Sequence, residues 1–238
     1  MVKEAILHSA GLDSFILKHY LDIHGHKFDC LYFNHGGRYV KNEVKYLDSY
    51  VKIITNLNLR DIEALDAFIP NRNILMSVMA NSMGYDKIWI GGSASDRVND
   101  NNEKVFEQLS DFLTKMNGRV IKVDSPFWHV YKEDMIEWFL KNGGKIHDLA
   151  EKTFSCFEPL KTPQNIQLTT QYTYQTTECL NCPACFRKCV SMWSARVYIP
   201  FNNKSIIKKY QTEFSNCLIK TPRSENTLHY IMEVNQRS

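Results

Sequence analysis

The stretch "LHSAGLDSFIL", residues 7–17, joins two different hydrophobic patterns. Residues 4–7 form a short apolar run typical of a buried strand, whereas residues 14–21 carry apolar side chains at helical spacing. The polar turn between them therefore predicts a strand-to-helix junction. At such a junction, backbone N–H groups and the positive end of the helix dipole face one point, which suits an anion. An ordinary capped helix is the alternative, because Ser and Asp are also common N-caps.

Length and composition predict one sizeable hydrophobic core with, at most, a small appendage. The chain has 238 residues, of which 44% are hydrophobic and 12% aromatic. No apolar run approaches the ~20 residues of a membrane span, and the N-terminus has no signal-peptide pattern. We therefore expect a cytoplasmic protein with no membrane partner. A formal net charge of +3, carried by scattered basic residues, does not indicate direct nucleic-acid binding.

Strand-like and helix-like segments alternate between residue 4 and about residue 126. The predicted strands are residues 4–9, 28–34, 60–65, 87–92 and 119–126. The predicted helices between them are residues 14–24, 42–58, 72–84 and 102–118. This alternation predicts an α/β fold with a doubly wound, parallel, five-stranded sheet.

Three polar turns that contain glycine fall at one edge of this predicted sheet. They are residues 9–14, 34–38 and 91–96, which follow the first, second and fourth strands. Ligands of such folds bind beyond the carboxyl ends of the strands. The three turns together therefore predict a binding site.

Four of the seven cysteines lie within eleven residues: Cys179, Cys182, Cys185 and Cys189. In a chain without an export signal, this clustering indicates a metal site rather than disulfides. The first three form a tight knuckle, and tetrahedral zinc needs a fourth ligand, from either Cys156 or Cys189. The spacing also matches a bacterial iron–sulfur run, although Val190 stands where that run has proline.

The remaining segments complete the expected organisation. With a further helix at residues 132–144, the α/β domain is expected to span residues 1–150. Residues 151–198 are expected to form a small zinc-binding subdomain of helical and irregular structure, because residues 151–178 are rich in Thr and Gln. Residues 199–238 are expected to be a C-terminal extension of unknown role.

The turn at residues 9–14 is neither a Walker A loop nor a dinucleotide fingerprint. It resembles the S-G-G-x-D-S pyrophosphate loop of the N-type ATP pyrophosphatases, the PP-loop superfamily. Small residues let the backbone approach a phosphate, hydroxyl and N–H groups donate to it, and Asp13 can hold magnesium. Ala10 stands where that loop has its second residue, glycine. A methyl group there is tolerable if φ is negative and costly otherwise.

Residues 1 to about 195 resemble the 7-cyano-7-deazaguanine synthase (QueC) family, which combines such a loop with a four-cysteine zinc site. The stretches that match the family, in order, are residues 33–43, 68–73, 91–96, 125–136 and 153–157. Two stretches depart from it. The family's Y-G-Q is His35-Gly36-Gly37 here, and its tyrosine-proline-aspartate-cysteine segment is replaced by residues 97–106, where Asp100 or Glu103 would stand for the aspartate.

The resemblance implies an adenine nucleotide alpha hydrolase-like fold and an ATP-dependent carbon–nitrogen ligase of queuosine (7-deazaguanine) biosynthesis. Its substrates would be ATP, ammonia and 7-carboxy-7-deazaguanine. The carboxylate is adenylated, ammonia displaces AMP to give the amide, and a second activation gives the nitrile. Its cofactors would be zinc and magnesium, and a homodimer is expected. The departures leave open a related enzyme that uses adenylation on another acceptor, with an amide as its only product or with a deazaguanine joined to a protein. They also leave open a non-catalytic iron–sulfur or nucleotide-binding module.

The resemblance also implies three groups of site residues. The ATP-binding group is His8, Ser9, Ala10, Gly11, Leu12, Asp13 and Ser14. The catalytic and substrate-binding candidates are Arg38, Glu43, Arg72, Asn73, Gly91, Asp96 and Lys132. The zinc ligands are Cys156, Cys179, Cys182 and Cys185, with Cys189 as a spare. His35 is either a functional donor or a polar loop residue.

Overall fold

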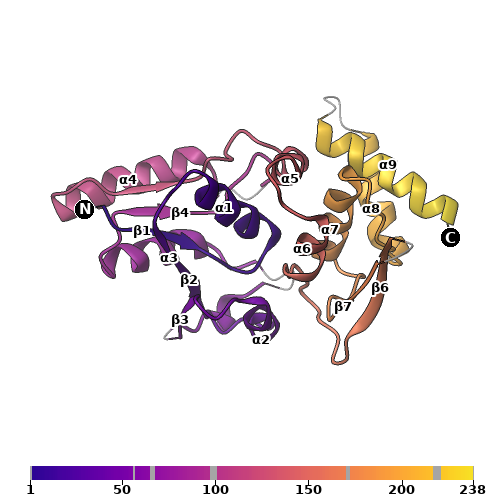
Figure 1. The fold of residues 1–238 in the computed structure, drawn as a ribbon, viewed down its shortest axis with the longest axis horizontal. Helices are drawn as coiled ribbons and strands as arrows, with labels where there is room; N and C mark the ends of the chain where they lie inside the picture. The colour runs from indigo at the N-terminus through magenta and orange to yellow at the C-terminus, as the bar shows by residue number, and fades with distance from the viewer. Residues whose placement is uncertain are drawn as a thin grey trace. The chain divides into compact units, whose positions relative to one another are not determined.

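The computed structural model describes residues 2–55, 57–64, 68–96, 101–169, 172–216 and 221–237. The chain divides into two compact units, Met1–Val130 and Tyr131–Ser238 (Figure 1). The domain limits expected at residues 150 and 198 stay predictions.

The first unit is built on a parallel five-stranded sheet in the order β3-β2-β1-β4-β5. Its strands are β1 (Glu4–Leu7), β2 (Phe28–Phe33), β3 (Lys52–Ile54), β4 (Lys87–Trp89) and β5 (Lys122–Asp124). Its helices are α1 (Leu12–Ile23), α2 (Val40–Glu43), α3 (Arg72–Ser82) and α4 (Glu103–Asn117), with short 3-10 turns η1 (Val44–Tyr46) and η2 (Arg60–Ile62). The strand order reverses between β1 and β4, which makes the carboxyl ends of these two strands the expected ligand edge. The predicted α/β fold is confirmed.

One hydrophobic cluster of this unit lies between the sheet and helices α3 and α4. Ala5, Leu31 and Ile88 of three neighbouring strands pack in one cluster with Ala80 of α3 and Phe106 of α4. Burial of these apolar side chains fixes the register of the central strands. That register brings the ends of β1, β2 and β4 together.

The third strand differs from the prediction. It lies at Lys52–Ile54, inside the segment 42–58 that was expected to be helical, and residues 60–62 form the turn η2 instead of a strand. Residues 51–54, Val-Lys-Ile-Ile, include three β-branched residues, which favour extended backbone. Parallel pairing with Leu31–Phe33 of β2 stabilises this extended segment, whereas a short isolated helix is only marginally stable.

The second unit combines a two-stranded hairpin with helices. Its elements are α5 (Lys132–Lys141), α6 (Ile146–Glu151), β6 (Gln164–Thr169), β7 (Tyr172–Thr176), α7 (Pro183–Ser194), α8 (Lys204–Ser215) and α9 (Pro222–Arg237). The hairpin corrects the expectation that residues 151–178 are irregular. Ile166 and Leu168 are buried at alternate positions of β6, a period-2 pattern that its Gln and Thr neighbours obscure.

The C-terminal segment has a structural role that the sequence analysis did not find. Tyr210 of α8 stacks on Phe186 of α7 with ring centroids 4.6 Å apart. Tyr230 of α9 meets the same ring edge-on at 5.8 Å. Helices α8 and α9 therefore cover α7, the helix that begins inside the cysteine knuckle. No helix in the described ranges is both long and apolar enough to span a bilayer.

Candidate functional site

The turn between β1 and α1 is closed by its two serine hydroxyls. Ser14 Oγ donates to the carbonyl oxygen of Gly11 at 3.0 Å, and Ser9 N donates to Ser14 Oγ at 3.3 Å. Gly11 N donates to Ser9 Oγ at 3.4 Å. These contacts hold the N-terminus of the 12-residue helix α1 at the carboxyl end of β1. The predicted strand-to-helix junction is confirmed, and its geometry suits an anion.

The loop after β4 packs directly against this turn. A Cβ atom at Gly91 would lie 3.2 Å from Asp13 Cβ and 3.2 Å from Ser14 N, which is tighter than most Cβ contacts. Only glycine leaves the two loops this close without a shift. Gly91 therefore brings the end of β4 into the site.

Ala10 has a left-handed backbone, with φ of 56°. This is the costly case for a methyl group, because Cβ crowds the following carbonyl oxygen in this region. The position is also fully buried, so the loop cannot relax freely. Ala10 strains the turn in the folded protein.

We expect the substitution Ala10→Gly to stabilise the protein by about 1 kcal/mol, since glycine adopts this φ without the Cβ clash. Urea unfolding of the two proteins measures the difference. A matched Ala80→Gly substitution, inside helix α3, should have the opposite sign. A lower midpoint for Ala10→Gly would contradict the strain.

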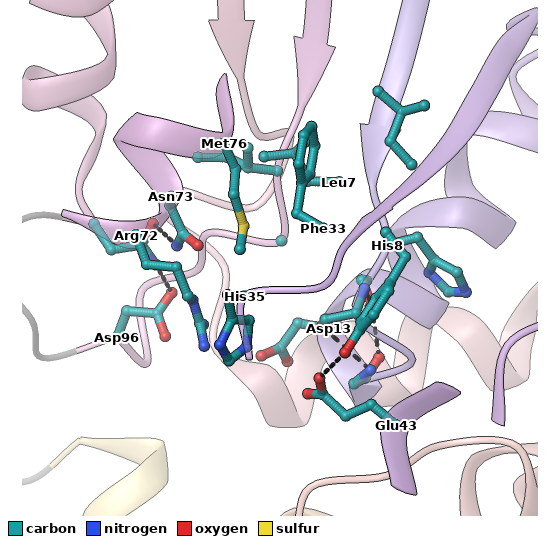
Figure 2. A pocket seen from close by; sticks show the side chains of 18 residues that line it. Leu7, His8, Asp13, Phe33, His35, Glu43, Arg72, Asn73, Met76 and Asp96 are labelled. Carbon is teal, nitrogen blue, oxygen red and sulfur yellow. Dashed lines mark hydrogen bonds between the residues drawn. The ribbon is translucent and has the colours of Figure 1, made fainter. Parts of the chain in front are cut away.

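A cavity of about 190 Å³ opens beside this turn, at the ends of β1, β2 and β4. Figure 2 shows the side chains around it. Its lining includes the predicted residues His8, Ser9, Gly11, Asp13, Ser14, Glu43, Arg72, Asn73, Gly91 and Asp96. It also includes Leu7, Leu31, Tyr32, Phe33, His35, Met76, Ile90 and Asn101. The site predicted from three separate turns is thus one hollow with apolar walls and polar groups.

His8 is buried at the end of β1, and burial, followed by the nearby Lys18 ammonium, lowers its pKa to about 4. Within the described ranges, its Nδ1 atom has no hydrogen-bond partner. The folded protein therefore keeps this imidazole neutral below the pH at which an unfolded chain would protonate it.

We predict that His8 makes the fold sensitive to acid. The unfolded chain binds a proton near pH 6.5 and the folded chain only near pH 4, so stability falls as the pH drops through this window. The shift corresponds to a loss of at most about 3 kcal/mol. In urea titrations between pH 4 and 7, His8→Gln should flatten this dependence relative to the wild type. His129→Gln, at a histidine with 82% of its side chain exposed, should leave it unchanged. A parallel pH dependence in wild type and His8→Gln would contradict the prediction.

Glu43 places a buried carboxyl group in the lining. The Tyr32 hydroxyl donates to Glu43 Oε2 at 2.6 Å. Burial raises the pKa of this carboxyl to about 7, although the Tyr32 hydrogen bond and the Arg72 charge oppose the shift. A carboxyl group with this pKa can exchange a proton at neutral pH.

Arg72, at the start of α3, donates from its Nη1 atom to the Tyr39 hydroxyl at 2.8 Å. The Tyr39 ring meets the His35 ring edge-on, with centroids 5.4 Å apart. His35 is buried, and burial followed by the Arg72 charge lowers its pKa to about 4. The structure therefore places His35 in the lining as a buried residue with a lowered pKa.

A chain of amide and carboxylate groups lies at the other side of the lining. Asn73 Nδ2 donates to Asn101 Oδ1 at 3.2 Å, and Asn101 Nδ2 donates to Asp96 Oδ2 at 2.9 Å. The backbone N–H of Ser93 donates to the same Asp96 oxygen at 2.9 Å. Helix α3 and the β4 loop are thus joined through side chains at the cavity.

Four predicted site residues are not among those lining the cavity. Arg38 pairs with Glu63 at 2.9 Å and donates to the carbonyl oxygen of Ala64 at 2.6 Å. Ala10 and Leu12 are buried in the turn behind the lining. Lys132 begins α5 in the second unit. Asp100, considered for the altered stretch after the fourth strand, lies outside the described residues, whereas Glu103 begins α4.

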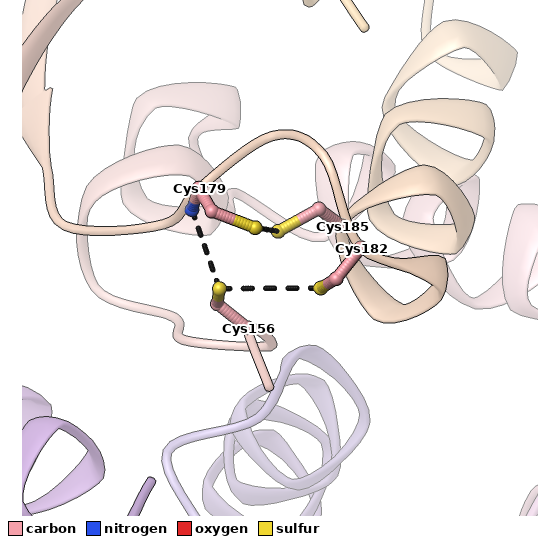
Figure 3. Close-up of side chains that lie close together, drawn as sticks. All are labelled: Cys156, Cys179, Cys182 and Cys185. Atoms are coloured by element: carbon pink, nitrogen blue, oxygen red, sulfur yellow. Dashed lines mark hydrogen bonds between the residues drawn. The ribbon is translucent and has the colours of Figure 1, made fainter. Parts of the chain in front are cut away.

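The cysteines of the second unit form a compact group (Figure 3). The Sγ atoms of Cys156, Cys179, Cys182 and Cys185 all lie within 4.8 Å of one another. Two of these separations are 4.0 Å (Cys156 to Cys182) and 3.9 Å (Cys179 to Cys185). Zn–S bonds of about 2.3 Å in a tetrahedron place sulfurs about 3.8 Å apart. The group therefore fits a single tetrahedral metal ion such as zinc.

Backbone N–H groups support these sulfurs. Cys179 N and Glu158 N donate to Cys156 Sγ at 3.2 and 3.3 Å. Cys189 is not in the group of four; it is buried in α7, where burial raises the pKa of its thiol to about 12. Of the two alternatives for the fourth ligand, the geometry favours Cys156. It does not suit a multi-iron cluster, whose thiolates bind different irons and lie farther apart.

A buried ion pair lies next to the knuckle. Lys188 Nζ is 2.8 Å from Glu178 Oε2, and the two side chains are 3% and 0% exposed. Lys188 also donates to the carbonyl oxygen of Thr153 at 2.8 Å, and Ser155 N donates to Glu178 Oε1 at 2.7 Å. The pair thus joins the loop before Cys156 to both sides of the knuckle.

Sequence reasoning missed several of these residues. Tyr32 lies inside a strand, where a tyrosine suggests only core packing. Asn101 lies in a polar run with no motif. Glu178 and Lys188 each precede a cysteine in the sequence. A charged residue next to a cysteine of the cluster was the signal that could have predicted their buried ion pair.

A family model and one named relative both point to one family. A family model described as "Queuosine biosynthesis protein QueC" matches residues 48–192. A protein from a Nitratiruptor species, named 7-cyano-7-deazaguanine synthase, is 26% identical over 199 residues, which cover 66% of this chain and 85% of that protein. A solved structure from Methanocaldococcus jannaschii, titled a predicted subunit of tRNA methyltransferase, covers 59% of this chain and 76% of its own at 17% identity and a TM-score of 0.43.

Proposed function

The chain belongs to the QueC family of queuosine biosynthesis proteins, and on this premise we propose that it is an ATP-dependent ligase that converts 7-carboxy-7-deazaguanine to 7-cyano-7-deazaguanine. The observation that carries the proposal is the cavity at the ends of β1, β2 and β4. It combines an anion-binding turn with a buried carboxyl group, a guanidinium and amide groups. These are the groups that a nucleotide and a carboxylate-bearing base would need.

The turn at residues 9–14 would bind the pyrophosphate of ATP. The N–H groups at the start of α1 and the Ser9 hydroxyl can donate to phosphate oxygens. The Ser14 hydroxyl would do so in place of its hydrogen bond to Gly11. Asp13, in the first turn of α1 and in the lining, is the carboxylate that would hold magnesium. When bound, magnesium supplies positive charge that neutralises the phosphates.

The reaction needs activation because a carboxylate is a poor electrophile. One carboxylate oxygen attacks the α-phosphorus of ATP, and the bond to the β-phosphate breaks to release pyrophosphate. Ammonia then forms the C–N bond, and AMP leaves with that oxygen. Glu43, whose carboxyl has a pKa of about 7, would accept a proton from the attacking nitrogen. The amide oxygen is adenylated in turn, and loss of a second AMP and two protons gives the nitrile.

The four cysteines would hold zinc in a structural role. Four thiolates complete its tetrahedral shell and leave no open position for substrate. Zinc would therefore shape the second unit and take no part in the chemical step. A cytoplasmic homodimer that acts on small molecules alone remains part of the proposal.

Oxygen-18 tests the adenylation directly. With both carboxylate oxygens of the acid labelled, the proposal predicts two molecules of AMP per nitrile, each with one labelled oxygen, and unlabelled pyrophosphate. Mass spectrometry of the nucleotides measures this. Label in inorganic phosphate, with ADP as the nucleotide product, would show phosphorylation instead and would overturn the proposed chemistry.

A ligase that stops at the amide, or that adenylates another acceptor, is the second candidate. Its support is the His35-Gly36-Gly37 stretch, which stands where the QueC resemblance has Y-G-Q. The stretch lacks that glutamine and places the His35 imidazole in the lining. The labelled reaction separates the two, because a single labelled AMP with amide as the end product would favour this candidate.

A further inference from the structure

Gly37, two residues after His35, holds the His35 ring in one orientation. Gly37 N donates to His35 Nδ1 at 3.3 Å. A Cβ atom at Gly37 would lie 2.6 Å from Cε1 and 2.8 Å from Nδ1 of this ring. The ring therefore occupies the space that any side chain at position 37 would need. Because Nδ1 accepts a hydrogen bond, the neutral ring carries its proton on Nε2.

Tyr39 orients both His35 and Arg72. Its hydroxyl accepts from Arg72 Nη1 at 2.8 Å, and its ring packs edge-on against His35. The Arg72 charge lowers the pKa of His35, which is consistent with two neighbouring side chains. In Figure 2 they lie side by side, between the turn that carries His8 and Asp13 and the group of Asn73 and Asp96.

Arg72 and His35 lie in a cavity whose other charged side chains are acidic. Asp13, Glu43 and Asp96 contribute carboxyl groups, whereas Arg72 is the one permanent cation among the described residues that line the cavity. A second anionic reactant beside ATP would be repelled unless donors compensate its charge. Arg72 and His35 both line the cavity, and the guanidinium and the Nε2–H can supply such donors.

We propose that Arg72 and His35 form the subsite that binds the carboxylate of the acceptor before its adenylation. This inference rests on the proposed function and names the part of the cavity that selects an acid. The bound carboxylate presents one oxygen to the α-phosphorus of ATP, from which pyrophosphate leaves. Because the amide of the second step carries no charge, that step depends much less on the pair.

The two half-reactions allow a test within one enzyme. The variants are Arg72→Gln, which removes the charge, and His35→Phe, which keeps a ring but removes the donor. With ATP saturating, kcat/KM is measured for 7-carboxy-7-deazaguanine and, separately, for the 7-amido compound. For Arg72→Gln we expect a loss of about 10- to 100-fold with the acid and less than about threefold with the amide, as for a charge-assisted hydrogen bond. His35→Phe should lose about 10-fold with the acid alone.

Lys41→Gln is the matched control, because it removes one exposed positive charge from α2 near the same segment. Its kinetics should equal those of the wild type with both compounds. Tyr39→Phe removes the hydroxyl that accepts from Arg72 and keeps the ring. Its loss of kcat/KM should be smaller than that of Arg72→Gln and again larger with the acid than with the amide. If thermal melting shows Arg72→Gln to be unfolded, Tyr39→Phe takes its place in the test.

The outcomes separate this inference from the function on which it rests. Equal losses with acid and amide, together with a raised KM for ATP, would mean that the pair serves the nucleotide, and would overturn the proposal. Unchanged kinetics in folded variants would overturn it as well. A wild-type protein that converts neither compound would instead refute the proposed function.

Discussion

Replacement of Cys182 by serine is expected to remove bound zinc and to unfold the region around the cysteines. The four Sγ atoms come from one loop and one knuckle, so a bound metal would link these two segments. Structural zinc contributes on the order of 10 kcal/mol to the folding of small domains. Atomic emission spectroscopy should find about one zinc per wild-type chain and almost none in the variant. Circular dichroism should show a matching loss of helix.

Cys189→Ser is the matched control for this prediction. Cys189 is also buried in the same unit but lies outside the group of four. This variant should retain its zinc and most of its helix. Full zinc content and unchanged melting in Cys182→Ser would contradict the metal site. A brown protein that contains iron would contradict zinc as the metal.

Glu178→Gln is expected to destabilise the protein by about 3–5 kcal/mol, the cost of breaking one partner out of a buried ion pair. Glutamine has nearly the same shape, but it leaves the ammonium of Lys188, which is 3% exposed, without its counter-charge. The loop that carries Cys156 would be held less firmly, since Ser155 and Thr153 bond to this pair. Urea unfolding measures the destabilisation, and chelator-driven release of zinc should become faster.

The double variant Glu178→Gln with Lys188→Met provides the control. Removing both charges leaves neither one buried alone, so the double variant should be more stable than Glu178→Gln. Lys141→Met, which breaks an exposed pair with Glu137, should change stability by less than about 1 kcal/mol. Additive losses in the double variant would show that the two charges are not coupled.

The strand-to-helix junction at residues 9–14 could be predicted because each signal there is local. The apolar run, the small polar turn and the helical spacing all lie within one short stretch of chain. The third strand could not be predicted this way. Residues 52–54 become a strand because β2 offers an open edge, and that partner is distant in sequence. The hairpin of β6 and β7 was hidden for a different reason, since its buried apolar positions are few among Gln and Thr.

In the candidate site too, residues with local signals could be predicted, and residues that act through tertiary contacts could not. Residues of one turn, such as Ser9 and Asp13, could be named from motif and resemblance. Tyr32, Tyr39 and Asn101 could not, because their importance comes from contacts with Glu43, Arg72 and Asp96 that only the folded chain creates. Whether the Ala10 methyl group is tolerated or strained depends on the backbone angle φ, which no sequence pattern provides.

The most direct test of the account is one mass-spectrometric measurement of the purified protein with ATP, magnesium, 7-carboxy-7-deazaguanine and ¹⁵N-ammonium. The account predicts a nitrile that carries one ¹⁵N atom, formed together with AMP and absent from the Asp13→Ala variant. Unchanged acid in the wild-type reaction, with zinc bound and the protein folded, would contradict the proposed function.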